Sequence, residues 1–535
     1  MSGTQGWGYA TAVALRRDRV RLLATVIGLG AMMVLLVTSL VTLYPDEAAR
    51  AGAALTLDNP GSTFLVGRIY HGHDYHWGIM TGHETLVVMA VAVAIGSIMV
   101  VTRHTRAEEE SGRTELLLSG VVGRHVPLLA GLTVAVAFNV VIAVVMTGVL
   151  LAVGEPSIDL AGSAVYGAAV GMVGLVFAGV AAVAVQLAST ARAANAMASA
   201  VLAASFLLRG VADVSPGASW LAWTSPLGWA QRSYPWHLDR WWPLVIGVAV
   251  AVLLALVGLA VSASRDLGAA LRPPRPGRAQ ATSALPHPVG LALRLHRGVL
   301  IGWAVGLVVF GLVYGPVLGD AEEFLTQMPL LIDFMPEAAQ AGGVRLFAAI
   351  LVALVAVVCC VPAGQALTRM LSDETAGRTA PLLSGGTTRL GWYLAGVAVA
   401  ALTAAVTTLA FGLAVGGTAV QVTGERALFG DIVVASVQQW SALAVVIGVA
   451  AVLVGWLPRA SWLLWLLVIW CGVVLYFAEL LDWPQWVRWS SPFDHLVARP
   501  AETGDDLTAR LVQWGLAVVL VAVGAVGYRR RTIDG

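Results

Sequence analysis

The sequence contains no lysine, little charge and few cysteines, and each scarcity excludes a class of function. Every one of its 32 Lys/Arg positions is arginine, so the GxxxxGK[ST] loop that cradles nucleotide phosphates cannot occur. The three cysteines, Cys359, Cys360 and Cys471, lie in apolar runs and offer neither a disulfide framework nor metal-ligand spacing. The formal net charge of +1 leaves no basic face for nucleic acid. If ATP drives this protein, another polypeptide binds it.

The composition is that of a membrane protein. Only 12% of the residues are charged and 58% are hydrophobic, whereas soluble domains are roughly 25% charged. Uncharged runs such as 22–43, 85–102 and 244–261 approach the roughly 20 residues that a helix needs to cross a bilayer. We therefore predict an all-α membrane protein with about twelve transmembrane helices. The predicted spans are 22–43, 84–102, 126–153, 161–188, 195–212, 242–263, 298–318, 346–366, 390–418, 431–456, 460–480 and 509–527.

The arginines predict the orientation, because short loops rich in basic residues stay in the cytoplasm. Arginine clusters at 16–21, 103–124, 265–297, 369–389 and 529–531 fall on one side of the predicted bundle, and most loop carboxylates fall on the other. The first apolar run is too long for a typical signal peptide, so we expect an uncleaved first span. We predict a multi-pass protein of the cytoplasmic (inner) membrane with both termini in the cytoplasm.

One charged phrase occurs twice. EEESGRTELLLSG at 108–120 returns as DETAGRTAPLLSG at 373–385, a displacement of 265 positions. A Trp-x-Ser-Pro group at 223–226 returns at 489–492, displaced by 266 positions. Both phrases fall at the same places in each set of six spans, which predicts two parallel repeats related by an axis along the membrane normal. We expect domains at 1–265 and 298–535, joined by a cytoplasmic Pro- and Arg-rich linker at 266–297.

The repeated phrase is the leading candidate for a functional element. Its carboxylates precede a leucine cluster too short to span a membrane. We expect a short surface helix with the carboxylates near its positive amino-terminal end and the leucines against a partner or the bundle. A solvated loop over a buried leucine cluster is the alternative, but occurrence in both halves favours a docking element.

This loop, its echo and the six-plus-six layout resemble the integral membrane subunits of ABC exporters for polyketide antibiotics, of the tetronasin-resistance type. The resemblance implies an ABC exporter permease fold, in which a homodimer of a separate ATP-binding subunit holds ATP and Mg while this chain binds no cofactor and has no catalytic residue. It also implies export of lipophilic or amphipathic compounds such as antibiotics, in contact with membrane lipid and without a nucleic-acid partner. The implied ATPase-coupling residues are Glu108, Glu109, Glu110, Gly112, Arg113, Thr114, Glu115, Asp373, Glu374, Gly377, Arg378 and Thr379. In the second copy Ala380 and Pro381 replace Glu115 and Leu116, which puts equal coupling by the two loops in doubt.

An ion-coupled secondary transporter of the six-plus-six kind is the alternative function, and a non-transporting membrane protein is a more remote one. Ion coupling needs ionisable groups at mid-membrane. Here Glu84, Asp213, Glu479 and Asp482 lie at the ends of predicted spans, which disfavours the secondary transporter.

Two further groups stand on the predicted outer face. We expect an ordinary polar loop at 68–84, because its histidines lack helical i, i+4 spacing and the second half has no counterpart; any metal or pH-sensing role there falls to His71, His73, His76 and His83. The Trp-rich stretches before the last span of each half fit an interfacial belt or a re-entrant outer gate. The residues assigned to this interface or gate are Trp223, Ser225, Pro226, Trp489, Ser491 and Pro492. Within the first half, Gly167, Gly171 and Gly174 are expected to let helices approach closely.

Overall fold

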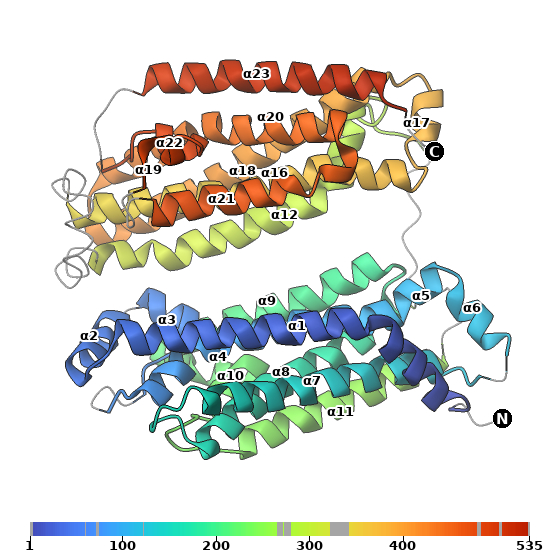
Figure 1. Cartoon of the computed structure of the whole chain (residues 1–535), viewed down its shortest axis with the longest axis vertical. Coiled ribbons are helices and arrows are strands. Elements are labelled where there is room, and N and C mark those ends of the chain that lie inside the picture. Colours follow the sequence, from blue (N-terminus) through green and yellow to red (C-terminus); the bar gives the residue numbers. More distant parts are fainter. Residues whose placement is uncertain are drawn as a thin grey trace. The chain divides into compact units, whose positions relative to one another are not determined.

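All regular secondary structure in the described part of the chain is helical. The computed structural model describes residues 4–58, 60–70, 74–120, 122–264, 271, 280–320, 342–478, 483–501 and 506–532, and none of these residues lies in a β-strand. Residue contacts divide the chain into two units, Met1–Pro276 and Gly277–Gly535 (Figure 1). The all-α prediction is therefore confirmed, and each unit is considered by itself.

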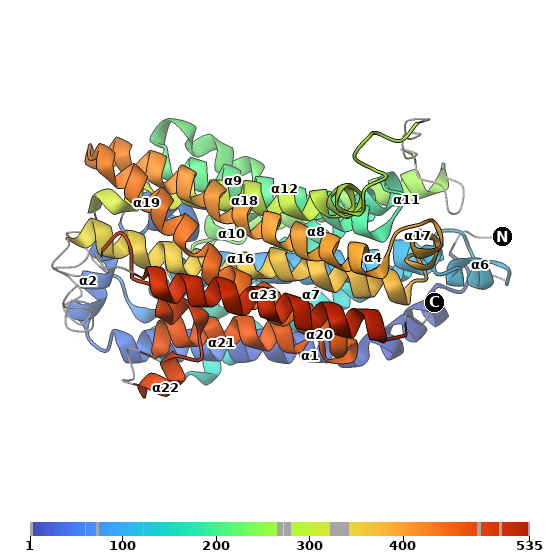
Figure 2. The same ribbon diagram turned by 90° about the horizontal axis from the view of Figure 1, so that it is seen from above.

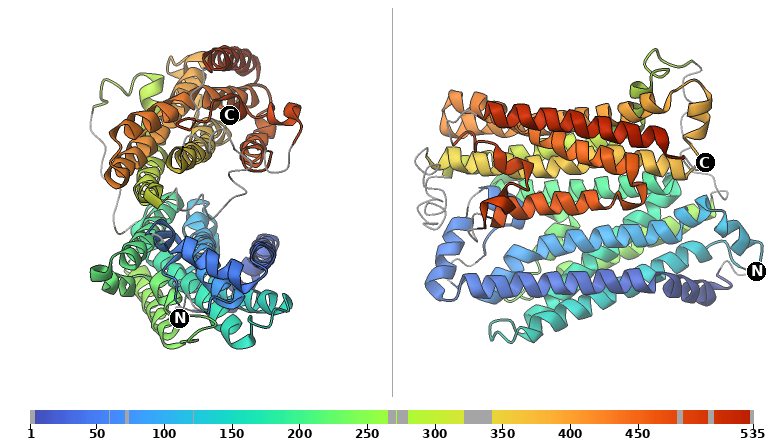
Figure 3. Two further views of the ribbon diagram at one scale, coloured as in Figure 1. Left: turned by 90° about the vertical axis from the view of Figure 1, so that its left-hand side faces the viewer. Right: turned by 45° about the horizontal axis from the view of Figure 1, so that its top comes forward.

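The first unit contains six long helices that run side by side and are seen nearly end-on in the left view of Figure 3. They are α1 (Trp7–Leu43), α4 (Trp77–His104), α7 (Val126–Ala152), α8 (Leu160–Leu187), α9 (Ala191–Val214) and α11 (Trp242–Ala263). Short helices join them: α2 (Glu47–Leu57), α3 (Pro60–Val66), α5 (Arg106–Glu110), α6 (Arg113–Leu118), η1 (Pro216–Thr224) and α10 (Pro226–Gln231). The α5 and α6 pair lies at one end of this unit, and α2 and α3 lie at the other, here called the far end (Figure 1).

The second unit repeats the plan with one span broken in two. Its long helices are α12 (Pro288–Tyr314), α16 (Gly343–Thr375), α18 (Arg389–Thr423), α19 (Arg426–Gln438) with α20 (Trp440–Trp456), α21 (Leu463–Phe477) and α23 (Leu507–Arg530). The short ones are η2 (Pro316–Asp320), α17 (Ala380–Ser384), η3 (Pro458–Ala460), α22 (Gln485–Arg488) and η4 (Pro492–His495). Figure 2 shows α23 running along α20, the most extensive helix pairing of this unit.

The spans agree closely with the sequence prediction. In the described residues eleven helices are long and apolar enough to cross a membrane, and a shorter apolar helix, Leu463–Leu475, stands at the twelfth predicted position. Three boundaries differ from the prediction: α1 begins at Trp7 and not at residue 22, α4 begins at Trp77 within the predicted polar loop 68–84, and α12 begins at Pro288, so the end of the predicted linker 266–297 is helical. Proline at the first helical position loses no hydrogen bond there, which is why the helix can start at this residue. Residues 265–270 and 272–279 of that linker lie outside the described residues.

Small residues let helix backbones meet in both units. In α8 a Cβ on Gly167 would lie 2.4 Å from the carbonyl oxygen of Ala143 in α7, and one on Gly174 would lie 1.8 Å from the Asn139 side chain. These positions confirm the predicted close approach. In the second unit a Cβ on Gly455 of α20 would lie 2.2 Å from the Gly524 carbonyl oxygen of α23. Close backbone packing, which is the main source of helix association in lipid, thus fixes the bundle on which the loops are mounted.

Candidate functional site

Both copies of the repeated phrase fold into the same turn. Gly112 has φ 73° and Gly377 has φ 68°, in the left-handed region that only glycine enters without strain. The Gly112 N–H donates to the Glu109 carbonyl oxygen at 3.0 Å, and the Gly377 N–H donates to the Glu374 carbonyl oxygen at 2.9 Å. The Gly-Arg-Thr core therefore marks a helix end with the same left-handed glycine and the same hydrogen bond in the two units.

An ion pair closes each turn. Arg113 Nη1 lies 3.7 Å from Glu108 Oε1, and Arg378 Nη2 lies 2.8 Å from Asp373 Oδ1. In both cases the arginine follows the carboxylate by five positions and reaches back across the glycine. The shared sequence pattern is thus an acid, a left-handed glycine and an arginine that forms an ion pair with the acid across the turn.

The acidic triplet of the first copy is engaged within the protein. Glu108 pairs with Arg17 of α1, and a Glu110 oxygen accepts a hydrogen bond from the Ala191 N–H at 2.6 Å, at the amino terminus of α9. A carboxylate at that position also meets the positive end of the helix dipole. The expected single surface helix is wrong in this respect, because Gly112 separates the carboxylates in α5 from the leucines in α6.

The third carboxylate holds a buried arginine. Glu109 Oε2 lies 2.6 Å from Arg106 Nη1, and the Arg106 residue is only 1% exposed. Arg106 also donates to the carbonyl oxygen of Ala188, which follows the last turn of α8. A buried guanidinium with charged and carbonyl acceptors fixes α5 firmly. The first loop is therefore attached to α1, α8 and α9 together.

The second copy is attached elsewhere. Glu374 is 4% exposed and accepts a hydrogen bond from Tyr528 Oη at 2.6 Å, and it pairs with Arg531. Tyr528 belongs to α23 and Arg531 follows it. Asp373 lies in addition 3.7 Å from Arg369 Nε of α16. The second loop is thus attached to the last helix of its unit.

The two loops also present different surfaces. In α6 Glu115 is exposed and Leu116 is 76% exposed. The corresponding positions of α17, Ala380 and Pro381, are exposed but carry little side chain. Thr114 and Thr379, the last residues of the shared Gly-Arg-Thr core, are both 1% exposed. The first loop therefore offers an apolar and acidic face that the second lacks. The side chains of Leu117 and Leu118 lie outside the described residues.

The repeated Ser-Pro pairs restart a helix after a break. Ser225 and Ser491 have extended backbones, with φ/ψ of −115°/126° and −95°/124°, and each precedes a proline at the first position of a short helix. An extended residue before proline and a proline at the helix start both follow from proline sterics. Both serines are at most 1% exposed. The sequence repeat at this place therefore has a structural counterpart.

These breaks return into the bundle. Ser225 Oγ donates to the Ser205 carbonyl oxygen at 2.8 Å, although α9 ends only at Val214. At 1.5 Å per residue the chain has returned about 14 Å along α9. In the second unit Trp470 Nε1 donates to Ser490 Oγ at 2.8 Å, again well before the end of α21. Of the two tryptophans assigned to the interface, Trp223 is 39% and Trp489 is 57% exposed. These contacts show a returning segment in each unit, and its role as a gate stays a prediction.

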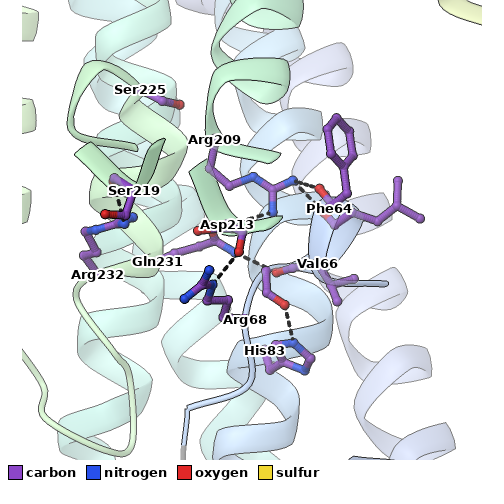
Figure 4. A network of polar contacts seen from close by, with 12 residues as sticks. Phe64, Val66, Arg68, His83, Arg209, Asp213, Ser219, Ser225, Gln231 and Arg232 are labelled. Atoms are coloured by element: carbon purple, nitrogen blue, oxygen red, sulfur yellow. Dashed lines mark hydrogen bonds and ion pairs between the residues drawn. The ribbon is translucent and has the colours of Figure 1, made fainter. Parts of the chain in front are cut away.

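At the far end of the first unit, side chains from α4, α9 and α10 take up successive carbonyl oxygens of the last residues of α3 and of Gly67, which follows it (Figure 4). Arg209 Nη2 donates to the carbonyls of Phe64 and Leu65 at 2.7 and 2.8 Å. Gln231 Nε2 donates to Val66 at 2.6 Å. Since the last carbonyls of a helix have no partner within it, this clasp anchors the short helix to α9 and α10. Sequence reasoning missed Arg209; the signal was an arginine inside a predicted span, four residues before Asp213.

Histidine completes the clasp. His83 Nε2 donates to the Gly67 carbonyl oxygen at 2.9 Å, so its Nδ1 accepts from Tyr75 Oη at 2.7 Å. Gly67 has φ 112°, and a Cβ there would lie 2.1 Å from Gln231 Nε2. His76 instead caps α4, accepting from the Ile79 N–H at 3.4 Å. Both ring nitrogens of His83 are therefore used within the protein.

The remaining metal candidates receive no support. His71 and His73 lie outside the described residues, and among those that are described no group of three or more His, Cys, Asp or Glu side chains is arranged to hold a metal ion.

In the described residues the two units are helical and contain eleven span-length helices, which together define a multi-pass membrane protein. A family model described as "Multidrug efflux system permease Rv1217c, C-terminal domain" matches residues 8–261 and 285–529, and the second of these ranges begins inside the predicted linker 266–297. A relative from Mycobacterium tuberculosis, "Multidrug efflux system permease protein Rv1217c", is 35% identical over 531 residues, covering 97% of this chain and 94% of the relative. The chain therefore belongs to this family of multidrug efflux permeases.

Proposed function

We propose that this permease is the membrane subunit of an ATP-driven ABC exporter, powered by a homodimer of a separate ATP-binding subunit. The observation that carries the proposal is the repeated loop, a rigid turn in each unit that is tied to long helices on one side and exposed on the other. A protein without a phosphate-binding loop needs such a mechanical connection to use ATP. The cargo is hydrophobic or amphipathic, and its restriction to polyketide antibiotics of the tetronasin-resistance type is the narrowest part of the proposal.

The geometry suggests how the loops would work. The exposed Glu115 and Leu116 of α6 are the docking residues, and Glu108, Glu109 and Glu110 transmit the movement to α1, α8 and α9. In the second unit Glu374 transmits it to α23. Closure of the ATPase subunits would bias each unit between two arrangements through these ties. The proposal places the chain in the inner membrane, with the two loops and both termini on the cytoplasmic side.

Transport in inverted vesicles tests the energy source. Vesicles containing the full chain with its ATP-binding subunit should accumulate a fluorescent lipophilic dye when MgATP is added, and vesicles containing the chain alone should not respond to a proton gradient. Proton-driven accumulation by the chain alone would overturn the proposal and establish the ion-coupled secondary transporter instead. A subunit variant unable to hydrolyse ATP is the control for dye partitioning.

A further inference from the structure

A polar cavity of about 180 Å³ opens beside the clasp at the far end of the first unit. Its walls come from the segment after α3, the end of α9, and the residues around α10, so it lies wholly within one unit. The side chains that give it its character are Arg68, Tyr70, Asp213, Gln231, Arg232 and Tyr234. None of the roles assigned above uses this cavity.

Positive charge exceeds negative charge around this cavity. Asp213 is the one carboxylate among its described lining residues, and it is shared by three arginines: Arg209 at 3.5 Å, with Arg68 and Arg232 close enough to act on it electrostatically. Arg209 is fully buried and belongs to the clasp. The guanidinium groups of Arg68 and Arg232 therefore line the cavity with no carboxylate besides the shared Asp213 among its described lining residues.

The lining arginines keep hydrogen-bonding capacity. Arg68 uses Nε on the backbone carbonyl of Asp213, and Arg232 Nη2 reaches the Ser219 carbonyl oxygen at 3.4 Å (Figure 4). In the described part of the chain neither forms an ion pair with a carboxylate side chain. Arg232 also lies 5.4 Å from the Trp223 ring centre, which supports its orientation. Planar guanidinium groups held in this way suit the two oxygens of a carboxylate or phosphate.

The part of the wall that contains Tyr234 is held by an unusual backbone turn. Tyr234, Trp236 and Asp239 all have positive φ, between 43° and 57°, which is rare for residues with a side chain. The turn is closed by a 2.7 Å hydrogen bond from the Arg240 N–H to the Ser233 carbonyl oxygen. It places the Tyr234 ring 4.8 Å from the Tyr70 ring. Unusual backbone of this kind concentrates at binding sites, where the surrounding structure maintains it.

We propose that this cavity binds the oxyanion of an amphipathic acid, a carboxylate or a phosphate, through Arg68 and Arg232. Its volume holds a charged headgroup but falls short of the roughly 300–1,000 Å³ typical of a site for a whole drug-sized molecule. The apolar remainder of the ligand therefore stays outside, against the bundle or the lipid. The site acts without ATP, so it stands independently of the energy source proposed above.

Equilibrium binding to the purified full chain in phosphatidylcholine nanodiscs, without any ATPase subunit, tests the site. The probes are a radiolabelled long-chain fatty acid and its uncharged methyl ester, each corrected for empty nanodiscs. We expect saturable binding of the acid, weaker at high salt, and little binding of the ester. The Arg68→Gln/Arg232→Gln variant should lose about tenfold or more in affinity, the scale of a charge-assisted hydrogen bond.

Controls separate the site from general charge and from misfolding. The Arg50→Gln/Arg488→Gln variant removes two arginines outside the cavity and should bind as the wild type does. Asp213→Asn removes the competing carboxylate and should raise affinity several-fold, a gain that misfolding cannot produce. Equal binding of acid and ester, or an unchanged Arg68/Arg232 variant, would overturn the proposal.

Competition between phosphatidylglycerol and the fatty acid distinguishes a lipid phosphate from an acidic cargo as the ligand. If phosphatidylglycerol in the nanodisc displaces the fatty acid from the wild type but not from the Arg68/Arg232 variant, a lipid phosphate occupies the site. If it does not, the site selects carboxylates and an acidic cargo is its ligand.

Discussion

The two copies of the Gly-Arg-Thr loop share their turn and differ in what the turn is fastened to. Both have a left-handed glycine and an ion pair between an acid and the arginine five positions after it. The first is tied to α1 by the Arg17–Glu108 pair, whose side chains are 37% and 12% exposed, whereas the second is tied to the end of α23 by the Arg531–Glu374 pair, whose side chains are 17% and 5% exposed. Duplication has thus kept the part that shapes the loop and changed the part that connects it. The two halves can therefore act differently through these ties and through the exposed face of α6, but not through the turn.

The largest effect is expected at the buried tie. Glu374→Ala removes the acceptor of Tyr528 and the charge facing Arg531, and breaking a buried pair in this way costs about 3 kcal/mol of stability. Thermal unfolding of the purified chain in one detergent, followed by tryptophan fluorescence, should show a clearly lower midpoint. A midpoint within error of the wild type would mean that the second loop is not held by α23.

A smaller effect is expected at the exposed tie. Arg17→Gln should cost about 0.5–1 kcal/mol, because an ion pair with a partly exposed arginine is weak and is screened by salt. The same unfolding measurement at low and high salt checks this, since the difference between variant and wild type should shrink as salt rises. A salt-independent loss larger than that of Glu374→Ala would reverse the comparison.

The turn itself should respond equally in both copies. Gly112→Ala and Gly377→Ala meet no atom within 4 Å, so the only penalty is that of a side chain at positive φ, about 1 kcal/mol each. Parallel unfolding curves of the two variants are the measurement. Unequal losses would show that one of the turns is not formed as described.

The smallest effect is expected at the two buried threonines. The hydroxyls of Thr114 and Thr379 have no hydrogen-bond partner among the described residues, so Thr→Val at either position removes a buried polar group that contributes nothing. Stability should stay level or rise only slightly in both variants, as read from the same unfolding midpoints. A loss at one position only would reveal a contact particular to that copy.

Much of the architecture could be predicted from sequence because the physics is local. Span-length apolar runs must be helical in lipid, and the duplicated phrases sit at equivalent places in the two sets of spans. Proline after Ser225 and Ser491 likewise determined a break that the structure contains. The helix α12 begins about three helical turns before the predicted span at 298, since nothing in the residues after Pro288 prevents a helix from starting there.

The ties could not be predicted in the same way. Glu108 meets an arginine 91 positions away and Glu374 a tyrosine 154 positions away, and no local pattern encodes such partners. The acidic triplet therefore looked like a surface for another protein. Arg209 was missed for the same reason, since its acceptors are backbone carbonyls 144 and 145 positions away.

The central claim is that the exposed face of α6 transmits ATP-driven movement, and a matched pair of leucines tests it most directly. Leu116 in α6 is 76% exposed and Leu55 in α2 is 75% exposed, so the same change to Asp perturbs the fold equally little at either place. The measurement is dye-stimulated ATPase activity of the co-purified complex in nanodiscs. We predict that Leu116→Asp abolishes stimulation or complex formation while Leu55→Asp leaves both unchanged; full stimulation in the Leu116 variant would contradict the account.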